Sequence, residues 1–487
     1  MSRFREIAAF APDDNSHYKL LPFRFSALND NNEYVISNSV GEFSVVNRVQ
    51  LQSIVDKTLP IGSELFEELQ AKHFVDYTDS DLSVDLLVLK LRTRLHRLAD
   101  FTSLHMVVVS LRCDHSCPYC QVSRQTEERS QYDMSFELAD KTLDFIFRSP
   151  SPAIKIEFQG GESLLNFEVI KFIVVEAKRR NLSYKRNLGF VAATNLSIAT
   201  DEMLQFFALE GVDVSTSLDG PRDIHNKNRP RPGKNSYEKA IAGIHRAREF
   251  VGKDRVSALM TTTEASLGRV KDIIDEYVRQ GFHGIFLRKL SPYGFAVKTD
   301  AIGAYTIDEW LDFYKEGVDY IIELNRNGVR IQEFFASVIL KKMLTSEDTG
   351  FVDLMSPAGI GIKALIYNYD GSVYASDEAR MLAEMGDHTF RLGNVATDSY
   401  ETIMLSPALL DPIDQSITVS APMCDECAFE PYCGADPVFH HGIHGDFLGR
   451  KPESSFCTRN MATFRYLIEK MRSDPFTKGL FYQWANR

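Results

Sequence analysis

The sequence has no long apolar run and no low-complexity stretch, and its basic residues are fewer than its acidic residues. Its 55 Lys and Arg residues are outnumbered by 67 Asp and Glu residues, which gives a formal net charge of −12. No polybasic run is present, so we expect no nucleic-acid partner. No apolar run approaches the ~20 residues that cross a bilayer, so we expect no membrane partner either.

The first fifteen residues lack the apolar core and the small-residue cleavage site of a secretory signal. We therefore expect the protein to be cytoplasmic. The hydrophobic fraction of 44% and the charged fraction of 25% are typical of globular proteins. A length of 487 residues favours two or three domains.

Cysteine is scarce, and its distribution is informative. Of the seven cysteines, three lie between residues 113 and 120 and four between residues 424 and 457. An odd, clustered set without a secretory signal argues against a disulfide framework. It favours metal ligation.

The middle of the chain alternates short apolar runs with amphipathic segments. The apolar runs are 104–111, 153–158, 188–193, 212–218, 256–261 and 284–290. The helix-like segments between them are 136–147, 167–179, 201–209, 236–250 and 269–280. Parallel strands are apolar because both faces are buried, and each crossover needs a helix. The pattern predicts an α/β fold, a partial (β/α)6 barrel over residues 100–325, with its chemistry at the carboxyl ends of the strands.

The flanking regions differ from this repeat. Within residues 1–95 we expect strands at 34–38 and 42–47 with a turn around Gly41, then helices at 48–57 and 63–72. This order suggests a small winged-helix-like module. Residues 350–460 combine short strands, Gly and Pro with four cysteines, and predict a further domain. A helix at about 459–471 and a tail complete the C-terminal segment, 461–487.

The first cysteine cluster has the spacing C-x3-C-x2-C and directly follows the first predicted barrel strand. Its members are Cys113, Cys117 and Cys120. Three such thiolates can bind three irons of a four-iron cube and leave the fourth iron open to a small molecule. The triplet alone would also fit a zinc knuckle or three buried thiols.

Further motifs follow the later predicted strands. They are Gln159-Gly160-Gly161-Glu162, Thr194-Asn195, Ser217-Leu218-Asp219-Gly220, Arg229 and Leu290. The adjacent glycines would let the backbone approach a ligand closely. In this order and at barrel spacing, the set favours an iron–sulfur site over zinc.

The second cluster reads Cys424-x2-Cys427-x5-Cys433, with Cys457 further along. Four thiolates in this arrangement can hold an auxiliary four-iron cluster. The same spacing could also support a four-cysteine zinc site. Because the first cysteine cluster lies in the same chain, we favour an iron–sulfur cluster over zinc at these four cysteines.

Together these motifs resemble those of radical S-adenosylmethionine (SAM) enzymes. The resemblance implies that Cys113, Cys117 and Cys120 hold a SAM-binding four-iron cluster, and that SAM is cleaved to a 5′-deoxyadenosyl radical. It implies an adenine contact for Tyr119 and a cationic contact with the SAM carboxylate for Arg229. The full set of implied SAM contacts is Tyr119, Gly160, Gly161, Glu162, Asn195, Ser217, Asp219, Arg229 and Leu290.

The C-terminal cysteines resemble the SPASM domain of peptide-modifying relatives, which usually holds two auxiliary clusters. Ser356, Gly371 and Ser376 keep the spacing of an upstream cysteine pair, with serine in both cysteine positions, and Pro437 occupies a further cysteine position. Hydroxyls and proline are poor iron ligands. The resemblance therefore implies one auxiliary cluster, held by Cys424, Cys427, Cys433 and Cys457, and two four-iron clusters in total.

Longer phrases resemble the His-Xaa-Ser-system radical SAM maturases. They lie at 20–25, 113–124, 156–167, 217–230 and 374–382. The resemblance implies an oxidoreductase that modifies a ribosomally synthesised precursor peptide, by cross-linking its side chains, with a flavodoxin or ferredoxin as electron donor. Residues 1–95 would then bind the leader of the precursor as an added strand, or would be a plain structural extension.

By the same resemblance, Asp377 is the candidate general base. Alternatively, Asp377 and Glu378 simply begin a helix, where acidic residues are favoured.

Three other functions stay open. A formylglycine-type, sulfatase-maturing enzyme would use the same barrel but normally keeps both auxiliary clusters. A small-molecule radical SAM enzyme would have no use for residues 1–95. A non-enzymatic, peptide-binding iron–sulfur protein would not need Glu162, Ser217 and Arg229 in SAM-binding positions.

Overall fold

The structure, a computed structural model, describes residues 18–125, 128–347 and 349–486. The signal-peptide argument on residues 1–15, like the first 17 residues of the predicted N-terminal module, lies outside the described residues. The chain divides into two compact units. Unit 1 comprises the residues up to His96 together with Pro422–Tyr432, and unit 2 comprises Arg97–Ala421 and Cys433–Arg487. Among the described helices, not one combines the length and the apolar character that a membrane span requires.

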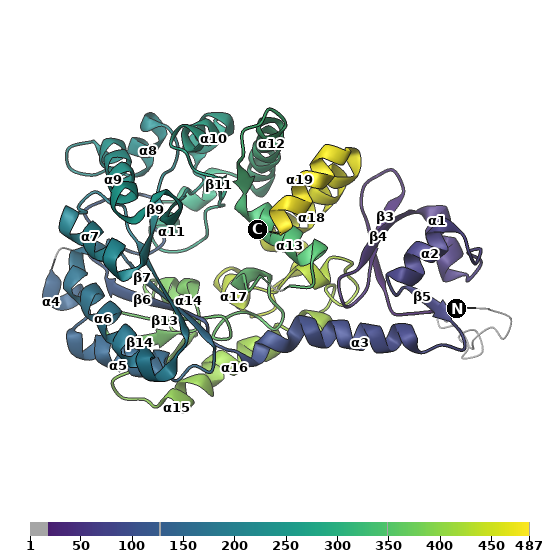
Figure 1. Cartoon of the computed structure of the whole chain (residues 1–487), viewed down its shortest axis with the longest axis horizontal. Coiled ribbons are helices and arrows are strands. Elements are labelled where there is room, and N and C mark those ends of the chain that lie inside the picture. The colour runs from purple at the N-terminus through teal and green to yellow at the C-terminus, as the bar shows by residue number, and fades with distance from the viewer. Residues whose placement is uncertain (1–17, 126–127, 348, 487) are drawn as a thin grey trace. The chain divides into compact units, whose positions relative to one another are not determined.

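Unit 1 is built on a three-stranded antiparallel sheet in the order β2-β3-β4. The helices α1 and α2 follow the sheet, and β1 pairs with β5 in a separate two-stranded sheet (Figure 1). The bounds are β1 Tyr18–Leu20, β2 Arg24–Ala27, β3 Glu33–Ser37, β4 Phe43–Asn47, α1 Arg48–Val55, α2 Glu64–Ala71, β5 Val75–Tyr77 and α3 Leu82–Leu95. The two strands and two helices predicted here are confirmed. The winged-helix description and the role in peptide recognition stay predictions.

Local signals explain these elements. Gly41 takes a positive φ of 82° in the turn between β3 and β4, a conformation that glycine adopts without strain. Asn47 and Gln50 form a reciprocal capping box at the start of α1, and the Ser63 side chain caps α2. Apolar residues of the sheet and the helices then share one core, which includes Ile36, Val46, Leu51, Ile54, Phe66, Leu69 and Phe74.

Residues 422–432 pack on the N-terminal part of unit 1, although they are some four hundred residues away in the chain. Arg24 Nη1 donates to Glu430 Oε2 at 3.1 Å, an ion pair that is largely buried. Ser37 Oγ donates to the Ala428 carbonyl at 2.5 Å. The Tyr432 hydroxyl donates to the carbonyl of Gly41 at 2.9 Å. The 350–460 segment, which the sequence suggested as one domain, is therefore divided between the two units.

Unit 2 contains an eight-stranded sheet in the order β10-β9-β8-β7-β6-β13-β14-β15. Its strands are β6 Leu104–Ser110, β7 Ala153–Gly160, β8 Asn187–Ala193, β9 Val212–Ser217, β10 Val256–Leu259, β13 Ala364–Tyr367, β14 Ser372–Tyr374 and β15 Arg391–Asn394. The first five predicted barrel strands are confirmed, and they run parallel. β13 lies parallel to β6, so the C-terminal region extends the sheet of the barrel.

The sixth predicted strand is shorter than expected. β11 covers only Gly284–Ile285 and pairs with β12, Gln332–Glu333, instead of with β10. The chain after β11 finds other partners, since the Leu287 amide donates to the Glu333 carboxylate at 3.1 Å and the Arg288 carbonyl accepts from Thr262. The barrel is therefore open at this point.

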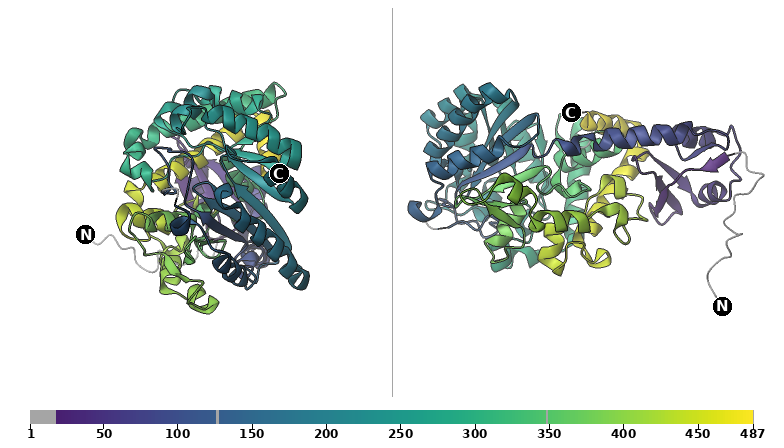
Figure 2. Two further views of the ribbon diagram at one scale, coloured as in Figure 1. Left: turned by 90° about the vertical axis from the view of Figure 1, so that its left-hand side faces the viewer. Right: turned by 90° about the horizontal axis from the view of Figure 1, so that it is seen from below.

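The helices that connect the parallel strands of unit 2 cover the outer face of the sheet (Figure 1 and Figure 2). The other helices of unit 2 come later in the sequence. The connecting helices are α4 Arg129–Tyr132, α5 Phe136–Ile146, α6 Phe167–Tyr184, α7 Asp201–Glu210, α8 Arg222–Asn228, α9 Ser236–Val251 and α10 Val270–Arg279. The later helices are α11 Phe295–Lys298, α12 Ile307–Arg326, α13 Phe334–Leu344, α14 Asp377–Ala383, α15 Tyr400–Met404, α16 Pro407–Gln415, α17 Pro437–His444, α18 Ser455–Ser473 and α19 Pro475–Ala485. The five predicted crossover helices and the predicted C-terminal helix are confirmed.

The Arg24–Glu430 contact leads to a prediction for Arg24→Met, which keeps the aliphatic stem and removes the guanidinium. A hydrogen bond between charged groups contributes about 1.5–3 kcal/mol, so the amides of residues 425–430 should exchange roughly ten- to a hundredfold faster. Hydrogen–deuterium exchange with mass spectrometry measures this. Lys19→Met, which breaks the exposed Lys19–Asp81 pair of the same unit, is the control. Unchanged exchange at 425–430 in Arg24→Met would show that the ion pair does not hold this segment.

Candidate active site

The first three cysteines lie in the loop that leaves the carboxyl end of β6. Cys113, Cys117 and Cys120 are partly exposed, and all three are free thiols. The Cys120 amide donates to the Cys117 carbonyl at 3.1 Å, and the Gln125 amide returns to the Leu111 carbonyl at 2.8 Å. The loop is therefore a closed, internally bonded structure.

The spacing of these thiols distinguishes between a zinc ion and an iron–sulfur cluster. One zinc ion with bonds of about 2.3 Å would bring its thiolates to about 3.8 Å from one another. Among the described residues, the one group of three such ligand atoms that all lie within 4.8 Å is Cys113, Asp114 and His115. The Asp114 carboxylate and the His115 ring already bond to each other at 2.9 Å. The three cysteines are thus spread more widely than a zinc site requires, which fits ligands to separate irons of one cluster.

Gly160 and Gly161 lie where β7 meets the start of the cysteine loop. A Cβ atom on Gly160 would come within 2.0 Å of the Ser110 carbonyl oxygen. A Cβ atom on Gly161 would come within 2.4 Å of the Arg112 carbonyl oxygen. We expected these glycines to admit a ligand, and the structure shows that they admit the backbone of the cysteine loop.

Glu162 joins the ends of β7 and β8. Its Oε1 accepts from the Thr194 hydroxyl at 2.6 Å and the Leu164 amide at 3.0 Å, and its Oε2 accepts from the Asn195 amide at 2.7 Å. Burial raises the pKa of Glu162 to about 7 despite these donors. Asn195 Nδ2 in turn donates to Asp114 Oδ1 at 2.8 Å, which connects this strand end to the cysteine loop.

Tyr119, Asp219 and Arg229 form one buried group. Asp219 Oδ2 accepts from the Tyr119 hydroxyl at 2.6 Å and from Arg229 Nε at 3.0 Å. The guanidinium of Arg229 lies 5.5 Å from the centre of the Tyr119 ring. Burial works to raise the pKa of Asp219, but neighbouring groups, with Arg229 foremost, outweigh it and leave the pKa lowered. Ser217 is the last residue of β9, beside Leu259 of β10.

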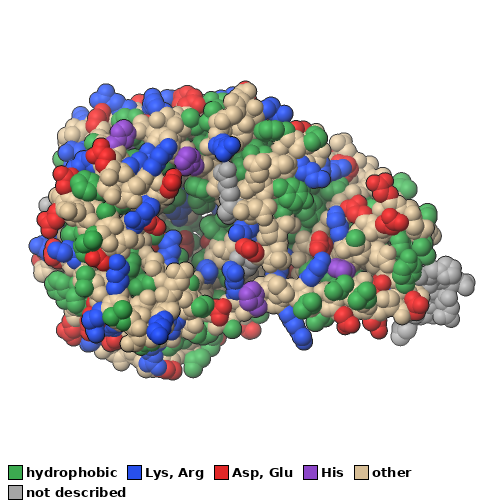
Figure 3. Space-filling view, viewed as in Figure 1, with side chains coloured by type: hydrophobic (Ala, Val, Ile, Leu, Met, Phe, Trp, Pro, Cys, Tyr) green, Lys and Arg blue, Asp and Glu red, His purple; other side chains and the backbone are tan. Residues whose placement is uncertain are grey.

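A separate cavity of about 320 Å³ lies in unit 2. The space-filling view shows this unit hollowed, with Lys and Arg side chains near the opening (Figure 3). Of the predicted SAM contacts, only Leu290 lines the cavity, and Asp377 lines it as well. The other predicted SAM contacts therefore lie around the cysteine loop, whereas Asp377, the predicted base, lies at the separate cavity.

Asp377 combines the two roles considered for it. It is the first residue of α14, and the Ser376 side chain caps this helix by accepting from the Ala379 amide at 3.2 Å. The residue also lines the cavity, with its Oδ1 at 3.5 Å from Arg380 Nε. Asp377 thus begins a helix and belongs to the wall of the cavity.

The residues that replace cysteine in the upstream pattern have structural partners. Ser376 is the cap of α14, and Ser356 Oγ accepts from the Thr418 amide at 3.0 Å. Pro437 is the first residue of α17, where its fixed φ suits the helix and no amide hydrogen bond is lost. These residues stabilise the local fold, and the expectation of a single auxiliary cluster stays a prediction.

The four C-terminal cysteines are divided between the units. In unit 1 the Cys427 amide donates to the Cys424 carbonyl at 3.1 Å, and Cys427 Sγ accepts from the Phe429 amide at 3.4 Å. In unit 2, Asn460 Nδ2 donates to Cys433 Sγ at 3.4 Å, and Cys457 lies in the first turn of α18. N–H groups directed at sulfur suit thiolate ligands. The auxiliary cluster itself stays a prediction.

Sequence reasoning missed most of the cavity wall. Asp353 and Asp436 line it together with Glu378, which the sequence suggested as the start of a helix and as the next candidate base after Asp377. These carboxyls come from three separate segments, and no spacing rule connects them. Thr194, whose hydroxyl donates to Glu162, was identified in the Thr194-Asn195 motif, but the sequence suggested no role for it.

Comparison with known proteins agrees with this geometry. Residues 107–276 match the family model described as the Radical SAM superfamily. An uncharacterised protein of Methanothermobacter thermautotrophicus is 27% identical over 221 residues, which cover 43% of this chain and 80% of that protein. The serine-type anaerobic sulfatase-maturating enzyme of Bacteroides thetaiotaomicron is 29% identical over 140 residues, 28% of this chain and 33% of that enzyme. The chain thus spans only a third of the length of this enzyme.

Solved structures resemble the fold over longer stretches. Native anSMEcpe with bound AdoMet and the Kp18Cys peptide has a TM-score of 0.64 at 18% identity and covers 78% of this chain and 99% of its own. Streptococcus suis SuiB bound to the precursor peptide SuiA has a TM-score of 0.54 at 11% identity, with coverage of 89% and 98%. The chain therefore contains a radical SAM domain over residues 107–276, in a fold similar to those of anSMEcpe and SuiB.

Proposed function

We propose that this protein is a radical SAM maturase that oxidatively modifies a ribosomally synthesised precursor peptide, by cross-linking its side chains. One observation carries the proposal. The motifs that follow β6, β7, β8 and β9 converge on one cysteine loop, and a separate cavity in the same unit is lined by Asp377 and Leu290. A cofactor site and a substrate cavity in one unit suit radical chemistry on a bound substrate.

The residues present fit the implied cofactors. Cys113, Cys117 and Cys120 would hold a four-iron cluster, and the neighbouring residues around Tyr119 and Glu162 would hold SAM. When bound, these cofactors supply a carbon-centred radical that removes a hydrogen atom from the substrate. The resemblance to SPASM proteins supports a second cluster at the four C-terminal cysteines.

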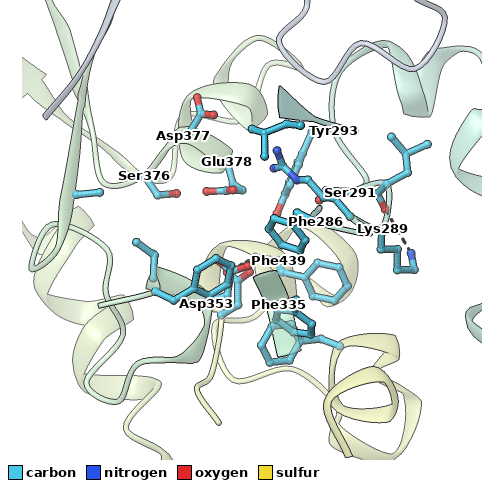
Figure 4. A pocket seen from close by; sticks show the side chains of 18 of the residues that line it. Phe286, Lys289, Ser291, Tyr293, Phe335, Asp353, Ser376, Asp377, Glu378 and Phe439 are labelled. Atoms are coloured by element: carbon cyan, nitrogen blue, oxygen red, sulfur yellow. Dashed lines mark hydrogen bonds between the residues drawn. The ribbon is translucent and has the colours of Figure 1, made fainter. Parts of the chain in front are cut away.

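The side chains of the cavity would do the rest. Phe286, Phe335 and Phe439 form apolar walls that exclude water from a reactive carbon (Figure 4). Cross-linking at carbon removes two hydrogens. One would leave as an atom, and the other would leave as a proton together with one electron, for which an auxiliary cluster at the C-terminal cysteines would be the acceptor. Asp377 lines the cavity, and its carboxylate would accept the proton.

Two kinds of similarity support a peptide substrate. The names of related proteins include serine-type and cysteine-type anaerobic sulfatase-maturating enzymes. The solved structures of similar fold include complexes with the Kp18Cys peptide and the precursor SuiA. The same relatives favour a second candidate, a sulfatase-maturing activity. A hydrazide probe for the formylglycine aldehyde, set beside mass spectrometry for an internal cross-link, separates the two products.

Unit 1 would recognise the leader of the precursor. Deleting it is not a clean test, because residues 422–432 with Cys424 and Cys427 pack on it. Point changes on the exposed surface of β2 or α3 that leave this segment in place would test recognition better.

The cluster assignment predicts about eight irons in the reconstituted protein, as two four-iron clusters. Changing Cys113, Cys117 and Cys120 together to Ala should leave about four, because the other four thiols are untouched. Iron and zinc analysis with electron paramagnetic resonance checks this. Twelve irons, or one zinc per chain retained after the triple change, would contradict the division of the cysteines.

The base assignment predicts that Asp377→Asn separates two activities. Asn keeps the size of the side chain and removes its basicity. 5′-Deoxyadenosine should still form in the presence of peptide, while modified peptide falls by roughly 10²–10⁴-fold. Chromatography with mass spectrometry measures both products. Glu202→Gln, an exposed change on α7, is the control. A wild-type yield of modified peptide from Asp377→Asn would exclude it as the base.

A further inference from the structure

The cavity contains a group of carboxyls with too little positive charge around it. Asp353, Glu378 and Asp436 come from different segments and line the same space, and Figure 4 shows Asp353 and Glu378. Arg288 and Arg459 act on Asp353. Burial first, and then the neighbouring carboxyls of Asp353, Asp377 and Asp436, raise the pKa of Glu378 to about 8.

A buried hydroxyl in the same wall lacks a partner. The Tyr293 side chain is 1% exposed and its hydroxyl has no hydrogen-bond partner among the described residues. The three carboxyls also act on this hydroxyl, which places it beside them. A phenolic hydroxyl can accept a hydrogen bond from a cationic N–H as well as donate one. A buried polar group without a partner costs free energy, so this hydroxyl indicates a ligand that completes it.

The remaining walls are aromatic. Phe286, Phe335, Phe439 and Phe456 line the cavity with Tyr293 and Trp310. Aromatic faces pack against an aliphatic stem and attract a cationic head. A cavity lined by both carboxyls and aromatic rings thus suits a long side chain with a terminal positive charge.

We propose that this cavity binds a cationic side chain of the substrate peptide, an ammonium or a guanidinium, with Glu378 and Asp436 as its counter-charges. The proposal rests on the proposed function and names the class of residue that is held beside Asp377. Asp353 and the Tyr293 hydroxyl complete the contacts of the cationic head. The positive charge of the ligand would offset the repulsion of the neighbouring carboxyls, which together with burial contributes most to the raised pKa of Glu378.

Binding should strengthen as pH rises. Burial and the neighbouring carboxyls raise the pKa of Glu378 to about 8 and that of Asp436 to about 7, so each holds a proton below its value. A lysine ammonium, with a pKa of about 10.4, stays charged throughout. Each bound cation therefore displaces about one proton, and affinity should rise roughly tenfold per pH unit between pH 6 and 7.

The other titratable and charged groups that line the cavity are Glu157, Asp353, Asp377, Tyr293, Arg288, Lys289 and Arg459. Burial lowers the pKa of Lys289 to about 8, with a further contribution from Arg459. Its loss of charge at high pH acts in the same direction as ionisation of the carboxyls. A Glu378→Gln variant retains Lys289 and so separates the two contributions.

The test is anaerobic calorimetry on the reconstituted, SAM-loaded enzyme. The probes are N-acetyl-lysine amide, N-acetyl-arginine amide and, as the uncharged match, N-acetyl-norleucine amide. At pH 8 we expect the lysine or arginine probe to bind at least tenfold more tightly than the norleucine probe, and the stronger of the two identifies the head group. Glu378→Gln should remove the preference, whereas the exposed change Glu202→Gln should keep it. Asp436→Asn should weaken the preference, while an Asn side chain still caps α17.

Equal binding of the norleucine probe would overturn the proposal, as would an unchanged preference in Glu378→Gln. Iron content and circular dichroism report whether each variant folds. If neither variant folds, the pH dependence of the wild-type enzyme's preference for the cationic probes is the test. A preference that does not change between pH 6 and 8 would count against the site. 5′-Deoxyadenosine formation in the same samples tests the proposed function separately. If SAM is cleaved but the cationic probes are not preferred, only the proposed cation site is contradicted. If the cationic probes are preferred but SAM is not cleaved, the proposed radical SAM activity is contradicted.

Discussion

The close backbone contact between the ends of β6 and β7 determines how the candidate site is arranged. Gly160 and Gly161 rest on the carbonyls of Ser110 and Arg112, at distances that exclude any side chain. Because the cysteine loop begins at this contact, its course is set by backbone packing. Glu162 follows at once and uses both oxygens to hold the end of β8. The thiols are therefore positioned by the polypeptide itself, and this preorganisation reduces the entropy lost on cofactor binding.

The packing of residues 422–432 gives unit 1 a second role. Arg24 and Ser37 hold a segment that carries Cys424 and Cys427, through an ion pair and a hydrogen bond that are largely shielded from water. If these cysteines ligate an auxiliary cluster, the part of the chain proposed to recognise the peptide also orders two of its ligands. Changes in β2 or β3 can then affect redox chemistry without touching the radical SAM domain. Such coupling is a physical reason for one chain to contain both.

The sequence predicts most of what depends on local pattern. Strands β6 to β10, their crossover helices and the turn at Gly41 follow from periodicity and glycine conformation, and both signals are local. The continuation of the barrel sheet by β13 and the short β11 could not be predicted, because strand order depends on competition among distant partners. At the site, Asp219 and Arg229 were both expected to contact SAM, and the structure bonds them to each other. Neither residue type nor spacing distinguishes a pair of ligand contacts from a charge pair that supports them.

Charge pairing differs between the two parts of the site, and the difference has a physical meaning. Around the cysteine loop, Glu162 is saturated with donors and Asp219 is neutralised by Arg229. Such satisfied groups form a rigid scaffold, since any movement would break a buried hydrogen bond. In the cavity, Glu378 faces other carboxyls and the Tyr293 hydroxyl is unpartnered. Unsatisfied groups destabilise the free protein and are retained where a ligand offsets that cost. Glu162 and Asp219 are therefore fixed before any ligand arrives, whereas Glu378 and the Tyr293 hydroxyl would gain a partner from a bound molecule.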